Sequence, residues 1–395
     1  MKYDLCIVGG AGHVGLPFGV TAANAGLKTV LFDINESWLK QIESGTFPFK
    51  EEQGDEELKK ALKKKTLFTS TRADSLSESK MILMVIGTPV DEHLNPDWRT
   101  LMRLVTSYLP YFRDGQTLIL RSTVYPGTSE RLQKLLTKNG KRVDVAFCPE
   151  RIAQGASLSE LRTLPQIVSA FDPETVKRVS AVFRRIAPTV VVTERPIEAE
   201  LAKLYSNAWR YIKFSVANQF YMMADQYGLD YHAIHDAMVR DYPRNKDLPR
   251  PGFAAGPCLF KDTMQLAAFN HNNFFLGHAA MLINEGMPNY VVHKLKRHLK
   301  GKPLKTVGIL GMAFKAESDD NRSSLSYKLR KIAESHADTV LCHDVYIEDP
   351  SFSSIEELMR RSHAVILATP HAEYRRIKPS AYPRTLFIDI WDFWK

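Results

Sequence analysis

The chain has 395 residues, more than one hydrophobic core usually serves, so two or three domains are expected. Hydrophobic residues make up 44% and charged residues 25%, as in ordinary globular proteins, and no stretch reaches the roughly 20 apolar residues of a membrane-spanning helix. The formal net charge is +9, but Lys and Arg are dispersed, and the one dense run, residues 59–65, predicts a solvated helix face. We therefore expect neither nucleic acid nor a membrane as a partner, and the charge suits a small polyanionic substrate.

The four cysteines lie far apart and show no metal-ligand spacing, so no metal site is expected. Cys6, Cys148 and Cys342 stand in apolar, strand-like runs and are predicted to be core residues. The chain begins with a strand-like run rather than a signal peptide. Both observations favour a reducing, cytoplasmic location.

Continuous apolar runs in the first half predict strands that are buried on both faces of a parallel sheet. They lie at residues 3–10, 29–34, 81–89, 117–120, 144–147, 166–170 and 189–193. Because helical stretches separate the first of these runs, we expect a doubly wound α/β domain over residues 1–195.

A glycine-rich turn follows the first run and opens a helix that is expected to end near Ala25. Gly10 permits the tight turn, Gly12 lets the backbone approach a pyrophosphate, and Gly15 lets helix and strand pack closely. Asp33, at the end of the second run, would accept hydrogen bonds from ribose hydroxyls and repel a 2′-phosphate. This domain is therefore predicted to bind NAD rather than NADP, the alternative being a glycine turn without a ligand.

Helical periodicity replaces β-type runs between residues 196 and 300. No Gly or Pro interrupts residues 197–227, so we expect one helix of about 45 Å at about 1.5 Å per residue. Its repeating stripe consists of Leu201, Leu204, Tyr205, Ala208, Tyr211 and Ile212. The length favours a homodimer built on this helix over an ordinary core helix.

The pattern of apolar runs recurs near the C-terminus and predicts a second doubly wound domain over residues 301–395. The runs lie at residues 305–311, 339–344 and 364–370. Gly308 and Gly311 stand in the first of them, but a third glycine is missing, so a second dinucleotide is not expected. Lys315 and Arg322 follow in the next loop, where they could face a phosphorylated ligand or remain solvated charges.

One cysteine stands apart from the other three. Cys258 follows a Gly/Pro-rich run, residues 251–257, and two residues separate it from Lys261 and Asp262. A thiol in such a turn, in a chain that binds a hydride acceptor, indicates a covalent nucleophile. A buried structural cysteine is the alternative.

Polar residues at helical spacing or after strands provide further candidates. Lys203 and Asn207 are four residues apart, so they project from one helix face and could hold the oxygen of a reacting carbon, unless they form ordinary polar surface. Thr123 and Glu150 each follow a predicted strand. Thr123 could position a water or a hydroxyl at that edge of the sheet.

Together these segments resemble the UDP-glucose/GDP-mannose dehydrogenase family of nucleotide-sugar dehydrogenases, over nearly the whole chain and in the right order. Besides the glycine-rich turn, the matching motifs are Gly87–Pro89, Ser122–Thr123 with Pro126–Thr128, Pro149–Arg151, Glu200 with Lys203 and Asn207, Cys258 with Lys261 and Asp262, Gly311–Lys315, Asp319–Arg322, Ala368–His371 and Asp389–Trp391. The resemblance implies an N-terminal NAD domain, a central dimerisation region over residues 196–300 and a C-terminal nucleotide-sugar domain.

The resemblance implies a four-electron oxidation of the C6 alcohol of a nucleotide sugar to the uronic acid. The implied catalytic residues are Cys258, Lys203, Asn207, Asp262, Thr123 and Glu150. Cys258 would carry a thiohemiacetal and then a thioester, which water releases, because a tetrahedral adduct is a better hydride donor than an aldehyde. Lys203 and Asn207 would hold the C6 oxygen. Asp262 with Thr123 would organise the base and the water, and Glu150 would assist.

The resemblance also implies binding residues. For the cofactor these are Gly10, Gly12, His13, Val14, Gly15, Asp33, Thr88, Thr123 and Lys261. For the substrate they are Lys203, Arg244, Arg250, Phe253, Lys315 and Arg322. Arg244, or in its place Arg250, would reach the substrate site of the partner subunit. An arginine suits that position because its planar fork binds hydroxyls or phosphate while it stays charged.

The chain departs from the family at one position: Pro257 replaces the second of two glycines that usually precede the cysteine. Because proline lacks an N–H and fixes φ, we expect the local loop to differ. Lys261–Asp262 resembles the UDP-glucose and GDP-mannose branches, whereas Tyr242–Arg244 resembles the N-acetylhexosamine branch, so the sugar stays open between UDP-glucose and a UDP-N-acetylhexosamine.

Two other functions are weighed against this one. A two-electron dehydrogenase of the 6-phosphogluconate or hydroxyacid type would need neither Cys258 nor the second α/β domain. A non-catalytic nucleotide-sugar sensor would be expected to have lost the cysteine, the lysine or the aspartate of the site, and all three are present.

Overall fold

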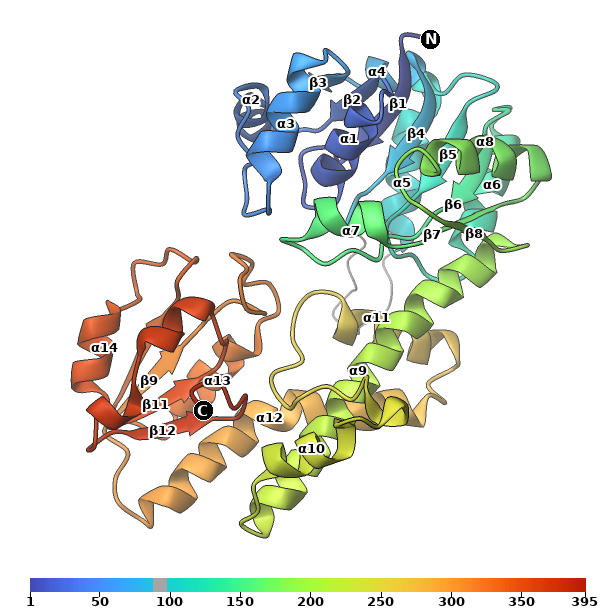
Figure 1. Ribbon diagram of the computed structural model, residues 1–395. Helices are drawn as coiled ribbons and strands as arrows, with labels where there is room; N and C mark the ends of the chain where they lie inside the picture. Colours follow the sequence, from blue (N-terminus) through green and yellow to red (C-terminus); the bar gives the residue numbers. More distant parts are fainter. Residues whose placement is uncertain (88–97) are drawn as a thin grey trace. The chain divides into compact units, whose positions relative to one another are not determined.

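The computed structural model describes residues 1–87 and 98–395, which form two compact units, Met1–Tyr205 and Ser206–Lys395 (Figure 1). Thr88, an expected cofactor contact, lies outside the described residues. Each unit contains a mainly parallel sheet with helices packed against it, which confirms the expected fold class. No helix in the described ranges is long and apolar enough to cross a membrane. The finer division at residues 195 and 300 stays a prediction.

An eight-stranded sheet forms the centre of the first unit, in the order β3-β2-β1-β4-β5-β6-β7-β8. Its strands are β1 (Tyr3–Val8), β2 (Thr29–Phe32), β3 (Leu67–Ser70), β4 (Ser79–Met84), β5 (Thr117–Leu120), β6 (Asp144–Phe147), β7 (Gln166–Ala170) and β8 (Val190–Val192). All neighbours are parallel except β6 and β7. The strand order reverses direction between β1 and β4, and ligands of such sheets bind at that point, beyond the carboxyl ends of the strands.

Helices cover both faces of this sheet. They are α1 (Gly15–Asn24), α2 (Glu36–Glu43), α3 (Gly54–Lys63), α4 (Asp74–Ser77), α5 (Trp98–Tyr108), α6 (Thr128–Lys138), α7 (Ser157–Thr163) and α8 (Pro173–Phe183). Side chains of α1, α3, α7 and α8 pack in one apolar core, and those of α5 and α6 pack in the core on the other face. Residues 59–63 of the dense lysine run lie on α3 and the last two lysines follow its end, and all five lysines of the run are exposed, as the charge pattern predicts.

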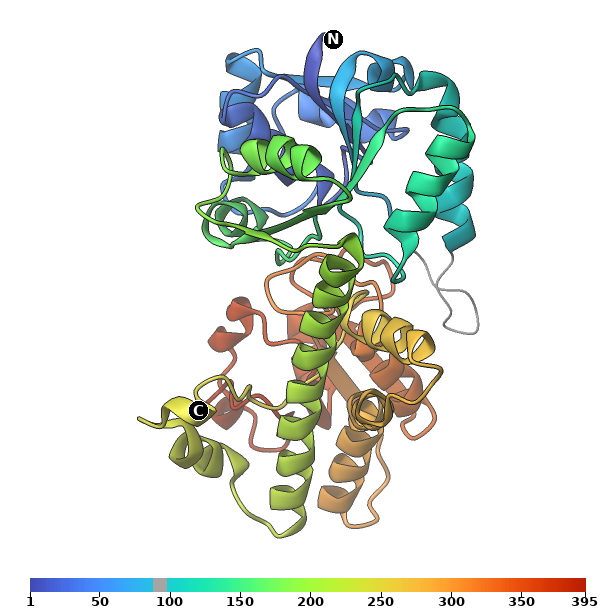
Figure 2. The same cartoon turned by 90° about the vertical axis from the view of Figure 1, so that its right-hand side faces the viewer.

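The expected long helix is α9 (Pro196–Gln226), whose 31 residues form one straight element (Figure 2). It belongs in part to each of the two units. Leu204, Ala208 and Tyr211 form its buried face. Tyr205 was expected on the same stripe but is exposed, because a helical repeat of 3.6 residues places it a quarter-turn beyond Leu204.

The second unit contains a four-stranded, all-parallel sheet in the order β10-β9-β11-β12. Its strands are β9 (Thr306–Leu310), β10 (Thr339–His343), β11 (Ala364–Leu367) and β12 (Leu386–Asp389). Its helices are α10 (Tyr231–Val239), α11 (Leu259–Phe269), α12 (Phe275–Leu299), α13 (Leu325–Glu334) and α14 (Ile355–Arg361). Side chains of α12 and α13 cover one face of the sheet and those of α14 the other. This order reverses between β9 and β11.

Candidate active site

The glycine-rich turn after β1 fits a dinucleotide. A Cβ on Gly10 would come within 2.7 Å of the Leu31 backbone, and one on Gly15 would collide with the carbonyl oxygen of Gly9, so both glycines are required by packing. At Gly12 the nearest atom to such a Cβ is 3.6 Å away, so here the missing side chain leaves room for a ligand instead. The N–H groups at the start of α1 are then accessible to a pyrophosphate.

Asp33 directly follows β2 beside this turn. Its carboxylate accepts hydrogen bonds from the backbone N–H of Ala11 at 3.0 Å and from that of Asn35 at 3.0 Å. These two bonds orient the carboxylate and leave acceptor positions for ribose hydroxyls. His13 lies within the turn, and its ring packs on that of Phe49 with centroids 4.0 Å apart.

The loop that carries Thr123 is held by a residue of α9. Glu200 is buried, and its carboxylate accepts from the N–H of Gly127 at 2.5 Å and from the N–H and hydroxyl of Ser129 at 2.9 and 2.6 Å. It thereby caps the N-terminus of α6. Burial raises the pKa of Glu200, and these hydrogen bonds only partly oppose the shift.

Glu150 pairs with a buried arginine that the sequence motifs did not single out. Arg121 follows β5, is fully buried, and meets the Glu150 carboxylate at 2.5 and 2.6 Å. The other carboxylate oxygen accepts from the N–H groups of Arg151 and Ile152. The guanidinium also lies over the ring of Phe18, 4.6 Å from its centroid. The acceptor positions of Glu150 are thus occupied, which suits a supporting role better than that of a base.

In the second unit, α9 and α11 bring two predicted catalytic residues together. The side-chain amide of Asn207 donates to the Asp262 carboxylate at 2.6 Å, and both residues are buried. Lys261 lies 3.2 Å from the other oxygen of Asp262. Lys203, one turn before Asn207 on α9, belongs to the first unit and is also buried. The contact between Asn207 and Asp262 fixes the orientation of the Asn207 amide against the buried Asp262 side chain.

Cys258 is the N-cap residue of α11, one turn before Asp262, and its carbonyl accepts the N–H of Asp262. It is exposed, whereas the other three cysteines are buried, as expected. Burial raises the pKa of Cys148 to about 12 and that of Cys342 to about 11, so these thiols stay protonated at neutral pH. The first turn of a helix favours the thiolate at Cys258.

Arg322 is an electrostatic neighbour of Cys258. Its guanidinium is held by Asp320 at 2.6 Å, and its pKa is raised, mainly by hydrogen bonds to Asp320 and further by the charge of Asp320 and of the Cys258 thiolate. The loop that carries Arg322 also touches the cysteine loop, because the Gly256 N–H donates to the carbonyl of Ser323. Lys315 lies in the same loop, 6.0 Å from the ring centroid of Phe314.

The remaining predicted substrate residues have different surroundings. Arg250 is engaged within its own unit by Asp236 at 2.8 Å and by Asp392 at 3.5 Å. Arg244 is exposed and makes no hydrogen bond or ion pair within the described ranges. Phe253 is buried in the core of the second unit.

Sequence reasoning missed a buried amide pair that holds the cysteine loop. Asn218 of α9 donates to the carbonyl of Gly252 at 3.0 Å and accepts its N–H at 2.8 Å. Asn284 of α12 accepts from the Asn218 amide at 2.9 Å and donates to the carbonyl of Tyr211. No local spacing could have indicated this network, because its hydrogen-bonded partners are 34 to 73 residues apart in the sequence.

Comparison with known proteins gives the geometry its context. Residues 3–187 match the NAD binding domain of the UDP-glucose/GDP-mannose dehydrogenase family, residues 197–285 its central domain, and residues 308–395 its UDP binding domain. The chain belongs to this family. It is an NAD-dependent nucleotide-sugar dehydrogenase, as the sequence motifs predict.

Curated relatives match this chain over nearly its full length. The UDP-N-acetyl-D-mannosamine dehydrogenase of Pyrococcus horikoshii is 28% identical over 379 residues, covering 93% of this chain and 90% of the relative. That of Methanocaldococcus jannaschii is 27% identical over 378 residues, covering 94% and 86%. The solved structure of UDP-D-ManNAc dehydrogenase from Pyrococcus horikoshii is 27% identical with a TM-score of 0.91, covering 99% of this chain and 96% of that chain.

Proposed function

We propose that this dehydrogenase oxidises the C6 alcohol of a UDP-N-acetylhexosamine, with UDP-N-acetylmannosamine as the first candidate, to the uronic acid through a cysteine thioester. The observation that carries the proposal is the group formed by Cys258, Asp262, Asn207 and Arg322 within one unit. The names of the curated relatives support the sugar. UDP-glucose is the second candidate, because Lys261–Asp262 resembles that branch.

The proposed reaction has three stages. Oxidation of the alcohol gives the C6 aldehyde, whose carbon the Cys258 sulfur attacks, so that a C–S bond forms and the former carbonyl oxygen takes a proton. Oxidation of this thiohemiacetal gives a thioester. Water then breaks the C–S bond, and the thiol leaves with a proton as the acid is released. NAD, when bound, accepts the hydride of each of the two oxidations.

Each predicted side chain has a physical task in this scheme. Lys203 and Asn207 stabilise charge that develops on the C6 oxygen. Asp262, a buried carboxylate fixed by Asn207, accepts a proton from the water that hydrolyses the thioester, and Thr123 orients that water. Glu150 supports the fold of its loop through Arg121.

The decisive experiment is NADH formation against a panel of UDP- and GDP-sugars, with the mass of the product measured. Two NADH per sugar and a product 14 mass units heavier than the substrate, about what replacing two hydrogens by oxygen adds, identify the four-electron oxidation. One NADH per turnover would support a two-electron dehydrogenase instead. Binding without any NADH formation would support a sensor.

We also propose that the active form is a cytoplasmic homodimer built on α9, in which Arg244 reaches the partner's substrate site. Exposed apolar side chains at Trp209, Val216, Phe220 and Met223 recur along one side of α9. Inactive Arg244→Ala and inactive Cys258→Ala subunits should regain part of the activity when mixed dimers form, because one intact site is then restored. Verified mixed dimers without activity would exclude the cross-subunit role.

A further inference from the structure

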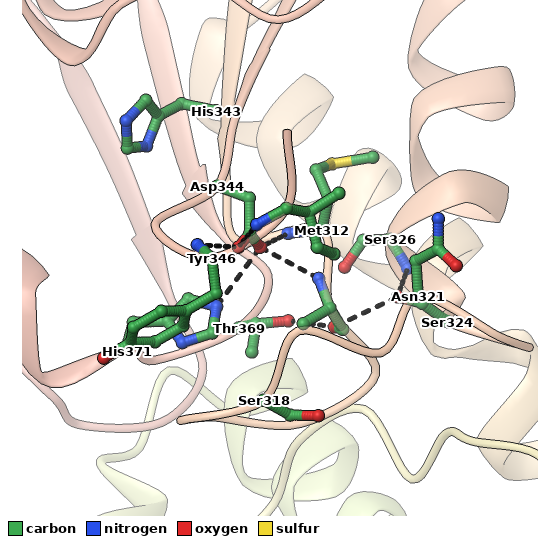
Figure 3. A network of polar contacts seen from close by, with 12 residues as sticks. Met312, Ser318, Asn321, Ser324, Ser326, His343, Asp344, Tyr346, Thr369 and His371 are labelled. Carbon is green, nitrogen blue, oxygen red and sulfur yellow. Dashed lines mark hydrogen bonds and ion pairs between the residues drawn. The ribbon is translucent and has the colours of Figure 1, made fainter. Parts of the chain in front are cut away.

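A single buried histidine joins the three strand-end segments of the second unit. The loop after β9 spans residues 312–324 and carries Lys315 and Arg322, whereas Asp344 follows β10 and His371 follows β11. Because the strand order reverses between β9 and β11, these segments line the place where such sheets bind ligands. Figure 3 shows Asp344 at the centre of their polar contacts.

Asp344 anchors the start of the loop. One carboxylate oxygen accepts from the N–H of Met312 at 2.5 Å and of Ala313 at 2.9 Å. The other accepts from the N–H groups of Tyr346 and Ile347. The Asp344 side chain has no exposed surface, so these bonds are made away from water, where they are strongest.

His371 links this carboxylate to the middle of the loop. Its Nδ1 accepts the backbone N–H of Glu317 at 3.1 Å, so the ring proton lies on Nε2, which donates to Asp344 at 3.2 Å. Glu317 has a φ of 56°, a left-handed conformation that a non-glycine residue adopts only when its surroundings hold it there. The histidine supplies one of those constraints.

The end of the loop is fastened to its start. The carbonyl of Ala313 accepts from the hydroxyls of Ser324 at 3.1 Å and of Thr369 at 2.7 Å (Figure 3). Between these ends, Asp320 holds Arg322, and Ser323 receives the N–H of Gly256 from the cysteine loop. The loop conformation therefore determines where Arg322 lies relative to Cys258.

We propose that His371, paired with Asp344, is a positioning residue for the substrate site: it sets the conformation of loop 312–324 and thereby the place of Arg322 beside Cys258. His371 does not touch the substrate. Its effect on catalysis rests on the proposed function, but its effect on the loop does not, and the two can be measured separately.

Two substitutions separate the bonds of His371. In His371→Asn the amide oxygen takes the place of Nδ1 and still accepts from Glu317, whereas in His371→Gln the terminal amide takes the place of Nε2 and reaches only Asp344. The readouts are the dissociation constant for UDP and the rate of alkylation of Cys258 by iodoacetamide, followed by peptide mass. The second readout needs no dehydrogenase activity, and the burial of the other cysteines keeps it specific.

We expect His371→Gln to weaken UDP binding and to slow the alkylation of Cys258 by about 3- to 10-fold each, the effect of one lost hydrogen bond. His371→Asn should show UDP binding and an alkylation rate close to those of the natural chain, because it keeps the bond to Glu317. Arg322→Gln, which removes the positive charge beside Cys258, shows the largest decrease in alkylation rate that the loss of Arg322 from its place can cause. His343→Gln is the matched control, because His343 is half-buried in the same sheet and bonds Tyr374 instead of the loop.

Equal effects of the Asn and Gln variants, or no effect of either, would overturn the proposal. If His371→Gln does not fold, Tyr346→Phe is the second variant, because it removes the hydroxyl that donates to Glu317 at 2.6 Å from the outer side of the loop. It should change both readouts in the same direction by about twofold, and unchanged readouts would count against the proposal. A chain that shows these shifts but oxidises no UDP-sugar would refute only the proposed function.

Discussion

Asn218 binds both backbone polar groups of Gly252 with one side-chain amide, as a neighbouring strand would. Gly252 has no room for a side chain, because a Cβ there would overlap the ring of Trp391. The start of the cysteine loop is thus held between a buried amide and an aromatic ring. Local order at Cys258 depends on this contact, although α9 supplies it.

Asn218→Ala should therefore reduce stability and activity together. It leaves the N–H and carbonyl of Gly252 and the side-chain oxygen of Asn284 without partners in a buried place, which costs about 2–4 kcal/mol of the free energy of unfolding. Urea unfolding and kcat/KM measure the two effects. Gln219→Ala, at the exposed neighbouring position, is the control, and equal unfolding energies for both variants would contradict the assignment.

Cys258→Ser should reduce acid production to background, because a serine hydroxyl is a weaker nucleophile than a thiolate at neutral pH. The variant is expected to release aldehyde or to retain a covalent adduct, and mass spectrometry of product and protein separates these outcomes. Cys342→Ala is the matched control at a buried position and should keep its activity. Acid production at the normal rate by the serine variant would eliminate the thioester route.

Asp33→Ala should narrow the preference for NAD over NADP. The carboxylate is oriented by Ala11 and Asn35, and its loss removes charged hydrogen bonds to the ribose worth about 1–3 kcal/mol, together with its repulsion of a 2′-phosphate. The measurement is kcat/KM for both cofactors. Asp33→Asn keeps a hydrogen-bond acceptor, so its preference for NAD over NADP should lie between that of the natural chain and that of Asp33→Ala. A natural enzyme that prefers NADP would refute this reading.

Asp344 should make the second unit sensitive to acid. Burial would raise its pKa, but hydrogen bonding and attraction from His371 and the bonds from Tyr346 and Ala313 outweigh burial and lower it from 3.8 to about 2. The folded state thus favours the carboxylate, so the stabilisation is complete above about pH 4 and is lost as the pH falls towards 2.

Urea unfolding of the natural chain and Asp344→Asn between pH 7 and pH 2.5 tests this expectation. The stability gap between them should shrink by about 2 kcal/mol as the pH falls through this window. Asp338→Asn, an exposed carboxylate of the same unit, is the control. A gap that is independent of pH would contradict the assignment.

Met223→Asp should shift the chain from dimer to monomer. Met223 is 51% exposed in the apolar stripe of α9, and a charge there would have to be buried in the proposed interface, at a cost of several kcal/mol. Light scattering over a concentration series measures the change. Phe171→Asp, at a comparably exposed aromatic outside α9, should leave the dimer intact. A natural chain that is monomeric at all concentrations would refute the dimer.

The elements that could be predicted from the sequence are those whose burial leaves a continuous signal. The runs at β5, β6 and β7 were predicted to the residue, because each is mainly apolar and almost wholly buried. β3 was missed because three of its four residues are half-buried. The antiparallel direction of β7 was also missed, since an apolar run records burial but not direction.

The candidate site likewise contains residues that a sequence pattern marks and residues that no pattern marks. Cys258, Asp262 and Asn207 could be predicted as site residues because helical spacing and family motifs mark them, and the structure brings Asn207 and Asp262 into contact. Arg121 was missed because its partner Glu150 lies 29 residues away, and Asn218 was missed because its partner lies 34 residues away. Pairs of this kind arise only when the chain folds, so no local pattern precedes them.

The two sheets place the same residue type at the same point and use it differently. Asp33 directly follows the second strand of its sheet and has two backbone donors, whereas Asp344 directly follows the corresponding strand and has four backbone donors and a histidine. Introducing a third glycine near Gly311 would therefore not give the second sheet a dinucleotide site. The carboxylate of Asp344 already accepts hydrogen bonds from the backbone of its own unit, so it could not bind the ribose. The two sheets thus use the same acidic position for different purposes: Asp33 keeps acceptor positions for a ligand, whereas Asp344 stabilises the backbone of its own unit.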